Sequence, residues 1–382
     1  MNSNTKTINN TGTFPVAGFC AEFIKDTLVD SSQAALITSP VNRQYVTGFK
    51  SSYGVVVITK SIKYLLTDGR YYEKATQSFS GYKVVLINEV SRENNQGLKS
   101  RLEHIFLKHS IDSLLVENTA MTISGLESYK KMFPFLEFDT SSRLSELLTR
   151  KRAVKTKWEI QKIEEAQRIA ERAFGKLLSK LKPGITEKKI AAVLGYYMLE
   201  LGADSLAFDI IAASGKNSSI PHATPTNKPL EDGEFLILDF GAVVDGYHSD
   251  MTRTVAVGNV TDSMKRVYDA VWAANIDALK AIRTDITGKL LDNVARSTLE
   301  AWGYESYFTH SLGHGVGLEV HEKPQLSIKA KNGISLRENM VITVEPGVYI
   351  PGKFGVRIED LAVVTKNGCK NLTKTPKKLI HI

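Results

Sequence analysis

The sequence has few cysteines and no long apolar run. Cys20 and Cys369 are its two cysteines, and they lie near opposite ends of 382 residues. Two cysteines do not build a disulfide framework, so each is expected to be a buried structural thiol. No apolar run reaches the roughly 18 residues that a membrane span needs. Residues 1–12 are rich in Asn and Thr and lack an apolar signal core, which predicts a disordered tail and a cytoplasmic protein without a membrane partner.

The sequence also lacks a focused patch of one charge. The net charge is +8, but the basic excess is spread over both halves of the chain. The two basic runs, at 150–157 and 374–378, are interpreted as solvated surface. Nucleic-acid binding normally needs a concentrated basic face, so we predict no nucleic-acid partner.

The length of the chain fits two domains rather than one core. The first part alternates apolar, β-branched segments with segments of helical spacing, which predicts an α/β domain over residues 13–149. Its predicted strands are 33–39, 54–60, 64–67, 83–88 and 113–117, and its predicted helices are 94–108 and 122–132.

The second part, residues 150–382, opens with a long amphipathic segment. Apolar residues recur at intervals of three and four from 157 to 180, and Pro183-Gly184 ends the pattern. Further helices are predicted at 186–201, 263–282 and 289–302. Strands are predicted at 208–212, 234–240, 243–257, 340–344 and 355–365, which gives an α+β domain.

A hairpin signal places two carboxylates together. Asp245-Gly246 between two apolar runs is a strong two-residue turn signal, and this turn pairs Asp239 with Thr252. Asp250 lies two residues from that partner, so Asp239 and Asp250 are diagonal neighbours on one face, within about 8 Å. Two acids this close in a buried place require a proton or a cation between them. The alternative is a pair of surface acids on an exposed hairpin.

Two glutamates later in the chain are also oddly placed. Glu345 closes the apolar strand at 340–344 and precedes Pro346-Gly347. Alternation in the next strand puts Arg357 and Glu359 on one face, where the arginine is predicted to orient a carboxylate. A plain cross-strand ion pair is the alternative. Asp360 falls on the opposite face and is not assigned to a site.

Four of the eight histidines fall in two short segments. His222 lies in Pro-His-Ala, and His310, His314 and His321 lie within twelve positions among glycines. The glycines argue against a helix and predict a loop that approaches another segment closely. His248, near the hairpin turn, is interpreted as a surface residue.

These residues resemble the pita-bread metallopeptidases, which include Xaa-Pro aminopeptidases, prolidases and methionine aminopeptidases. The resemblance covers residue 150 to the end and implies an α+β pita-bread (creatinase/aminopeptidase) catalytic domain. Ala223 departs from the Gly that commonly follows the matching histidine, a change expected to affect loop packing more than chemistry. The matching segments are Leu238–Ala242, Tyr247–Thr254, His310–Glu322, Thr343–Gly347 and Gly355–Asp360.

The resemblance implies a site of two divalent metal ions. Its ligands would be Asp239, Asp250, His314, Glu345 and Glu359. Four carboxylates and one imidazole form a hard donor set that suits Mn²⁺, with Co²⁺ or Zn²⁺ as alternatives. The implied catalytic residues are His222 for holding the substrate, His321 for the oxyanion, Glu345 for the proton of the attacking water, and His310 and Arg357 as supporting groups.

The front part resembles, more loosely, the N-terminal domain of creatinases, prolidases and Xaa-Pro aminopeptidases. The matching segments are Asn42–Phe49 and Leu65–Tyr71, and within them Arg70 is assigned either to a substrate or partner contact or to a structural salt bridge. The domain implies an Xaa-Pro aminopeptidase, acting on peptides with proline in the second position, and a homodimer. The main alternative is a prolidase. A binding protein without catalysis and a metal-free creatinase-like hydrolase are disfavoured, because both would be expected to lack the acidic ligands.

Overall fold

The computed structural model describes residues 17–78, 81–87, 96–330 and 334–382, so the predicted tail at 1–12 lies outside it. The chain divides into two compact units between Lys151 and Arg152, inside helix α6 (Arg143–Ala153). Each unit has its own sheets and its own hydrophobic core. Within the described ranges, no helix combines the length and the apolar character that a membrane crossing requires.

The first unit is built on a mixed six-stranded sheet in the order β4-β3-β2-β1-β5-β6. β2 runs antiparallel to its neighbours β1 and β3, and the remaining neighbouring strands pair in parallel. Leu36, Val57 and Phe106 belong to the core between this sheet and its helices. The strands are β1 (Gln33–Ile37), β2 (Val55–Thr59), β3 (Lys63–Thr67), β4 (Lys83–Leu86), β5 (Ser113–Val116) and β6 (Glu137–Asp139).

The predicted strands of this unit are confirmed to within two residues at each end, as are helices α4 (Gln96–Lys108) and α5 (Ile123–Met132). The remaining helices lie outside the predictions, because they are short and carry little apolar periodicity. The signals for α2 are nevertheless present in the sequence. Ser39 caps it by accepting from the Asn42 N–H, Pro40 begins it, and Gly48 ends it with a left-handed φ of 70°. The unpredicted helices are α1 (Ala17–Thr27), α2 (Pro40–Thr47), α3 (Gly69–Ser78) and the boundary helix α6.

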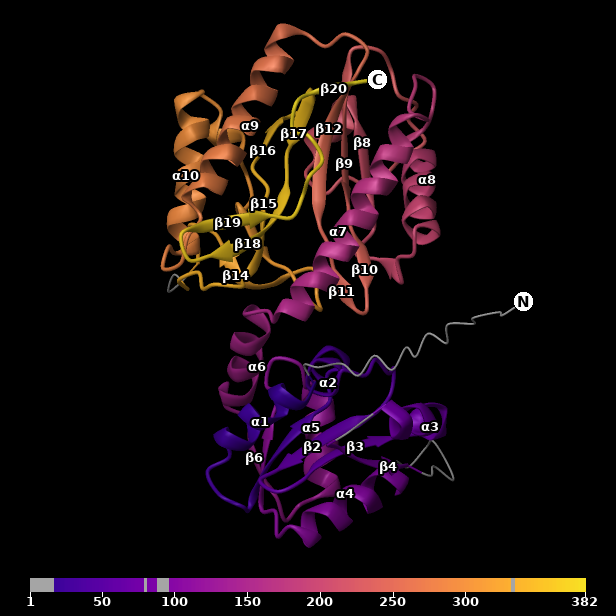
Figure 1. Ribbon diagram of the computed structural model, residues 1–382, viewed down its shortest axis with the longest axis vertical. Coiled ribbons are helices and arrows are strands. Elements are labelled where there is room, and N and C mark those ends of the chain that lie inside the picture. Colours follow the sequence, from indigo (N-terminus) through magenta and orange to yellow (C-terminus); the bar gives the residue numbers. More distant parts are fainter. Residues whose placement is uncertain (1–16, 79–80, 88–95, 331–333) are drawn as a thin grey trace, which may run out of the picture. The chain divides into compact units, whose positions relative to one another are not determined.

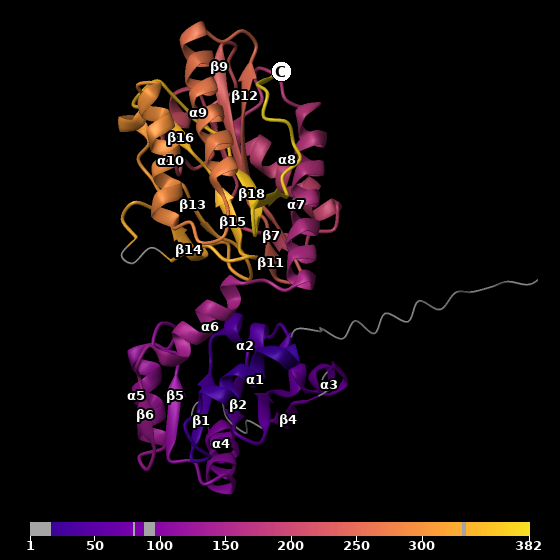
Figure 2. The same cartoon turned by 60° about the vertical axis from the view of Figure 1, so that its left-hand side comes forward.

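The second unit places its strands between two pairs of helices. Figures 1 and 2 show α7 and α8 on one side and α9 and α10 on the other. The long sheet has the order β20-β12-β9-β8, and a second sheet has the order β14-β13-β15-β18-β19. The helices are α7 (Lys157–Leu178), α8 (Glu187–Glu200), α9 (Asp262–Ala281) and α10 (Gly288–Ala301). The strands of these two sheets are β8 (Ile211–Ser214), β9 (Glu234–Phe240), β12 (Met251–Val257), β13 (Gly313–Gly315), β14 (Glu322–Leu326), β15 (Val341–Val344), β18 (Asp360–Thr365), β19 (Gly368–Asn371) and β20 (Ile380–His381).

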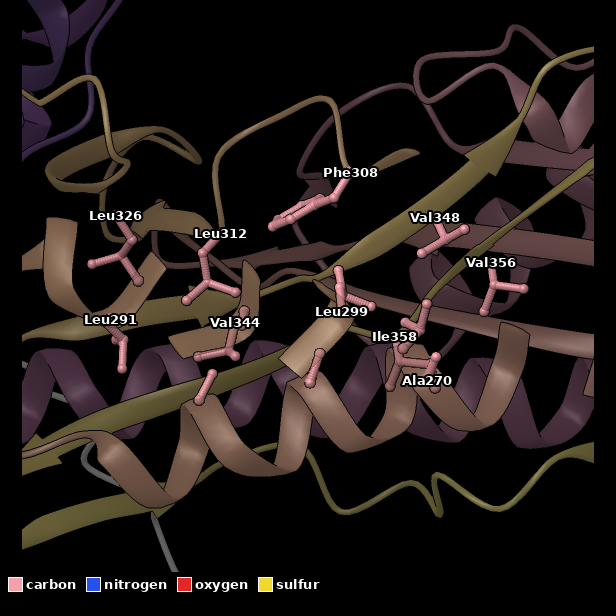
Figure 3. Packing of buried hydrophobic residues seen from close by; sticks show 14 of the residues in the cluster. Ala270, Leu291, Leu299, Phe308, Leu312, Leu326, Val344, Val348, Val356 and Ile358 are labelled. Carbon is pink, nitrogen blue, oxygen red and sulfur yellow. The ribbon is translucent and has the colours of Figure 1, made fainter. Parts of the chain in front are cut away.

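All four predicted helices of this unit are confirmed to within two residues. α7 begins with a capping box between Thr156 and Glu159, and its apolar stripe, including Ala170 and Phe174, is buried against the long sheet. On the other side, apolar side chains of α9 and α10 pack onto the strands, as Figure 3 shows for Ala270 and Leu299.

Three strand predictions are wrong in detail. The strand predicted at 208–212 lies at Ile211–Ser214. The segment predicted as one strand from 243 to 257 is a hairpin followed by a break, with β10 (Ala242–Val244), β11 (Tyr247–His248) and then β12. The segment predicted at 355–365 breaks at Glu359, because β17 (Phe354–Arg357) pairs with β16 (Gly347–Ile350), whereas β18 pairs with β15. The chain thus passes from one sheet to another at this glutamate.

The predicted hairpin register is confirmed. Val244 pairs with Tyr247, and the same register continues to the pair of Asp239 and Thr252. The turn residues Asp245 and Gly246 both have positive φ, 52° and 84°, as a type I′ turn requires.

Candidate metal centre

Asp239 and Asp250 come from neighbouring antiparallel strands. Asp239 lies on β9, opposite Thr252 of β12, and Asp250 directly precedes β12. The Asp250 side chain is buried and that of Asp239 is 14% exposed, so the alternative of two acids on an exposed hairpin is wrong.

His314 reaches Asp250 and Glu345 from β13. Its ring Nδ1 donates to the carbonyl oxygen of Gly315 at 3.1 Å, which leaves the lone pair of Nε2 free to face the carboxylates. Nε2 lies 3.4 Å from Oε1 of Glu345 and 3.7 Å from Oδ2 of Asp250. The predicted close approach is confirmed, because a Cβ atom on Gly313 would lie 2.3 Å from the Thr343 carbonyl oxygen. The predicted loop is partly wrong, since Gly313–Gly315 form a short strand.

The two glutamates are anchored through their main chains. The Glu345 N–H donates to the Leu312 carbonyl at 2.8 Å, and the Glu359 N–H donates to the Thr252 carbonyl at 3.1 Å. The Thr252 hydroxyl donates to Oε2 of Glu359 at 2.7 Å. Glu359 is 2% exposed, so its carboxylate lies at the buried crossing between the two sheets.

The electrostatics of these groups are those of an acidic cluster that Arg357 compensates only in part. Burial, and then the charges of Glu359, Asp239 and Glu345, hold the pKa of Asp250 well above its ordinary value. Burial and the charges of Glu345 and Asp239 do the same to the pKa of Glu359. The pKa of Glu345 is raised to about 8, chiefly by burial. Burial lowers the pKa of His314 to about 4, so its imidazole is neutral at neutral pH.

Divalent metal fits this arrangement. One ligand atom from each of Asp250, His314 and Glu359 lies within 4.8 Å of the others. Oδ1 of Asp239 is buried and has no hydrogen-bond partner in the described part of the chain. A buried orphan oxygen beside three further acids needs a positive charge, and a divalent cation supplies it while favouring the ionised carboxylates.

Asp239 is also held by a chain of hydrogen bonds that runs through Arg357 and Tyr349 to His310. Arg357 donates from Nη2 to Oδ2 of Asp239 at 2.6 Å and from Nη1 to the Tyr349 hydroxyl at 2.7 Å. His310 Nε2 lies 2.9 Å from that hydroxyl, and its Nδ1 donates to the Ser311 carbonyl at 2.8 Å. Because Nδ1 of His310 carries the proton, Nε2 is the acceptor, and the Tyr349 hydroxyl donates to it. Arg357 contacts Asp239 rather than pairing with Glu359 as a plain ion pair. Tyr349 is absent from the predicted site because a tyrosine in an apolar strand carries no sequence signal of a site.

The two remaining predicted histidines lie at the exposed side of the cluster. His222 and His321 are both exposed. The His321 ring lies edge-on to the His314 ring, with centroids 4.4 Å apart. The segment before His222 is held to the centre, because the Pro221 carbonyl accepts from Nη1 of Arg357 at 3.2 Å.

Several residues interpreted as surface are buried or half-buried. Lys155 of the first basic run is fully buried beside Glu322 at 3.3 Å, and Arg152 donates to the other oxygen of the same carboxylate. His248 is half-buried, and its N–H donates to the Gly317 carbonyl at 2.8 Å. The sequence pattern around Arg152 and Lys155 does not show that both side chains contact Glu322, about 170 positions later in the chain.

Two smaller assignments are also resolved. Cys369 is half-buried rather than buried. The side chain of Cys20 lies outside the described part of the chain. Arg70 forms a salt bridge with Asp68 at 2.6 Å, which agrees with the structural alternative.

The raised carboxyl pKa values predict a pH-dependent stability of the metal-free protein. A carboxyl whose pKa is higher in the folded state than in the unfolded state binds more protons when folded, so stability falls as pH rises. His310 and His314, with pKa values of about 4, act in the opposite sense only below about pH 6.5, the unfolded value. Between about pH 6.5 and 8 the free energy of unfolding falls by about 1.4 kcal/mol per pH unit for each carboxyl that still holds a proton.

Thermal unfolding of the protein in chelator should therefore show a Tm that falls as pH rises over this window. With saturating Mn²⁺ the Tm should depend less on pH. An unchanged Tm in chelator would contradict the assignment of these protons.

The donor set and the fold together define a metal-dependent hydrolase of the pita-bread type. Residues 161–366 match the model of metallopeptidase family M24, and residues 29–154 match the Creatinase/Prolidase N-terminal domain. The chain therefore belongs to metallopeptidase family M24, and it carries the N-terminal domain that the sequence predicts.

Known relatives resemble the chain over almost its full length. The Xaa-Pro dipeptidase of Pyrococcus furiosus is 36% identical over 351 residues, which is 92% of this chain and 96% of that protein. The structure of a Xaa-Pro dipeptidase from Bacillus anthracis has a TM-score of 0.89 at 36% identity and covers 96% of this chain and 100% of that one. The structure of an X-Pro aminopeptidase from Thermotoga maritima MSB8 has a TM-score of 0.85 at 36% identity and covers 92% and 97%.

Proposed function

We propose that this protein is an Xaa-Pro aminopeptidase that uses two divalent metal ions held by Asp239, Asp250, His314, Glu345 and Glu359. The observation that carries the proposal is the convergence of four carboxylates and one neutral imidazole on strands or at strand ends, with an orphan oxygen on Asp239. Two cations bound by these residues would supply a water that is activated for attack at neutral pH.

The protein's own side chains have distinct roles in this proposal. Glu345 accepts the proton of the attacking water, because the bound cations would keep its carboxylate ionised and beside that water. His321, exposed beside His314, donates to the oxyanion that forms on the scissile carbonyl. His222, also exposed, holds the substrate chain, while Arg357, Tyr349 and His310 keep Asp239 in place.

The runner-up is a prolidase, which performs the same chemistry on dipeptides alone. The names of the relatives include both activities and do not separate them. A non-catalytic binding protein is disfavoured because the full acidic donor set is present. The same proposal includes manganese as the native metal, assembly as a homodimer and a cytoplasmic location. The oxygen-rich donors support the choice of manganese.

The test compares peptide lengths. Purified protein is stripped with chelator, refilled with Mn²⁺, Co²⁺ or Zn²⁺, and assayed on Xaa-Pro-Yaa tripeptides and Xaa-Pro dipeptides. Metal-dependent release of the first residue from tripeptides is the expected result. Activity confined to dipeptides would establish the prolidase instead. If the protein binds metal but hydrolyses neither tripeptides nor dipeptides, the remaining alternative is a non-catalytic binding protein.

A further inference from the structure

The buried amide of Asn275 contacts the segments that carry two glutamates of the candidate metal centre. Asn275 lies on α9, is 0% exposed, and belongs to the helix face that packs into the apolar core. α9 packs against β15, β16 and β17, the strands that lead to and from the two glutamates of the centre. A buried amide in such a face is costly unless it is hydrogen-bonded, so its partners indicate what it does.

Asn275 bonds to the residue before each glutamate. Its Nδ2 donates to the carbonyl oxygen of Val344 at 2.9 Å and to that of Ile358 at 3.3 Å. Val344 immediately precedes Glu345, and Ile358 immediately precedes Glu359. Its Oδ1 accepts from Nζ of Lys377 at 2.9 Å, which fixes the orientation of the amide.

Each of these contacts holds a whole peptide plane. The carbonyl of one residue and the N–H of the next lie in one rigid plane, so fixing both ends fixes the Cα of the second residue. On the N–H side, Glu345 donates to the Leu312 carbonyl and Glu359 to the Thr252 carbonyl. Asn275 supplies the carbonyl side of both planes and therefore connects the two segments through one group.

The connection matters because the pairing between the two segments is interrupted at the glutamates. Val344 pairs with Asp360 and Gly347 with Arg357, and between these two pairs the chain leaves the strands. Glu345 follows β15, whereas Glu359 lies where the chain passes from β17 to β18. The separation of their carboxylates depends on the relative position of these segments. Asn275 bonds to both segments at this interruption and therefore contributes to that separation.

We propose that Asn275 is a positioning residue that fixes the spacing of Glu345 and Glu359, and thereby the affinity of the protein for its pair of metal ions. The inference rests on the proposed function, in which these glutamates are ligands. Removal of a group that orients metal ligands typically costs 10–100-fold in affinity.

The test replaces Asn275 and measures metal binding directly. Asn275→Leu keeps the size and removes both donors, and Asn275→Asp removes the donors while keeping a partner for Lys377. Chelated protein is titrated with Mn²⁺ by calorimetry, and its Tm is measured in chelator. The matched control is Gln167→Leu, because Gln167 is also fully buried but donates to the Thr373 hydroxyl at 3.2 Å rather than to a ligand-bearing segment.

The expected result is a weakening of Mn²⁺ binding by about 10–100-fold in both Asn275 variants. Gln167→Leu should lower the Tm in chelator without changing the affinity. If Asn275→Leu fails to fold, Asn275→Asp carries the same expectation. Mn²⁺ affinities within about twofold of wild type, with a Tm loss like that of the control, would overturn the inference and leave the proposed function intact. Failure of the wild-type protein to bind Mn²⁺ would overturn both.

Discussion

Glu345→Gln is expected to abolish peptidase activity while making the metal-free protein more stable. The substitution removes the proposed proton acceptor, which alone contributes about 10²–10⁴-fold, together with one metal-ligating oxygen. The same carboxyl is half-buried beside other acids, with 18% of its side chain exposed, and its pKa of about 8 means that its ionised form is disfavoured in the fold. A neutral amide of the same shape relieves a buried, unpaired charge, whose cost is typically about 1–3 kcal/mol or more.

The measurement has two parts. kcat/KM for the Mn²⁺-loaded variant should fall by about 10³-fold or more. The Tm in chelator, measured one pH unit above the pKa of Glu345, should rise. Glu165→Gln on α7 is the matched control, because this glutamate is 55% exposed and paired with Lys162, and neither quantity should change. An active variant, or one whose Tm in chelator falls, would contradict the placement of Glu345.

Arg253→Met is expected to destabilise the catalytic unit by about 3–5 kcal/mol, because it leaves several buried acceptors without a donor, at about 1–3 kcal/mol each, and leaves Asp360 with Lys377 as its remaining cation. Arg253 is 1% exposed and lies 2.8 Å from Oδ1 of Asp360, which is fully buried. It also donates to the carbonyls of Thr252, Glu359 and Thr375, so its loss leaves several buried acceptors unsatisfied. For a unit of this size, the expected fall in Tm is roughly 6–20 °C.

An exposed pair of the same length provides the control. Arg168 and Glu164 are also 2.8 Å apart, but Arg168 is 68% exposed, and Arg168→Met should change stability by no more than about 0.5 kcal/mol. Adding Asp360→Asn to Arg253→Met should cost less than the sum of the two single changes, because each single change already breaks the contact between these two residues. Equal losses for Arg253→Met and Arg168→Met would contradict the buried role of this pair.

The parts of the site that follow from local geometry could be predicted from the sequence. The two-residue turn at Asp245-Gly246 admits one register, and that register by itself places Asp239 opposite Thr252. The alternation that groups Arg357 with Glu359 also holds, since Arg357 Nε and Glu359 Oε2 both bond to the Thr252 hydroxyl. Long amphipathic helices such as α7 were equally predictable, because their period repeats over many residues.

The parts that depend on distant segments could not be predicted. Nothing in the apolar run around Glu359 shows that it leaves one sheet for another, because both halves have the composition of a buried strand. Lys155 looks like a surface cation until the fold brings its partner Glu322 to it. Tyr349 and Asn275 look like ordinary members of an apolar strand and an amphipathic helix, and only their hydrogen bonds distinguish them.

The type I′ turn at Asp245-Gly246 has a consequence for protein engineering. Asp245 is 41% exposed at the tip of a hairpin, the kind of place usually chosen for an epitope tag or a fused domain. Yet side chains alternate along a strand, so a one-residue slip transmitted from this tip would turn Asp250 away from Asp239. Here the length of an exposed turn is constrained by the chemistry of a buried centre, and surface exposure alone is a poor guide to where this chain tolerates an insertion.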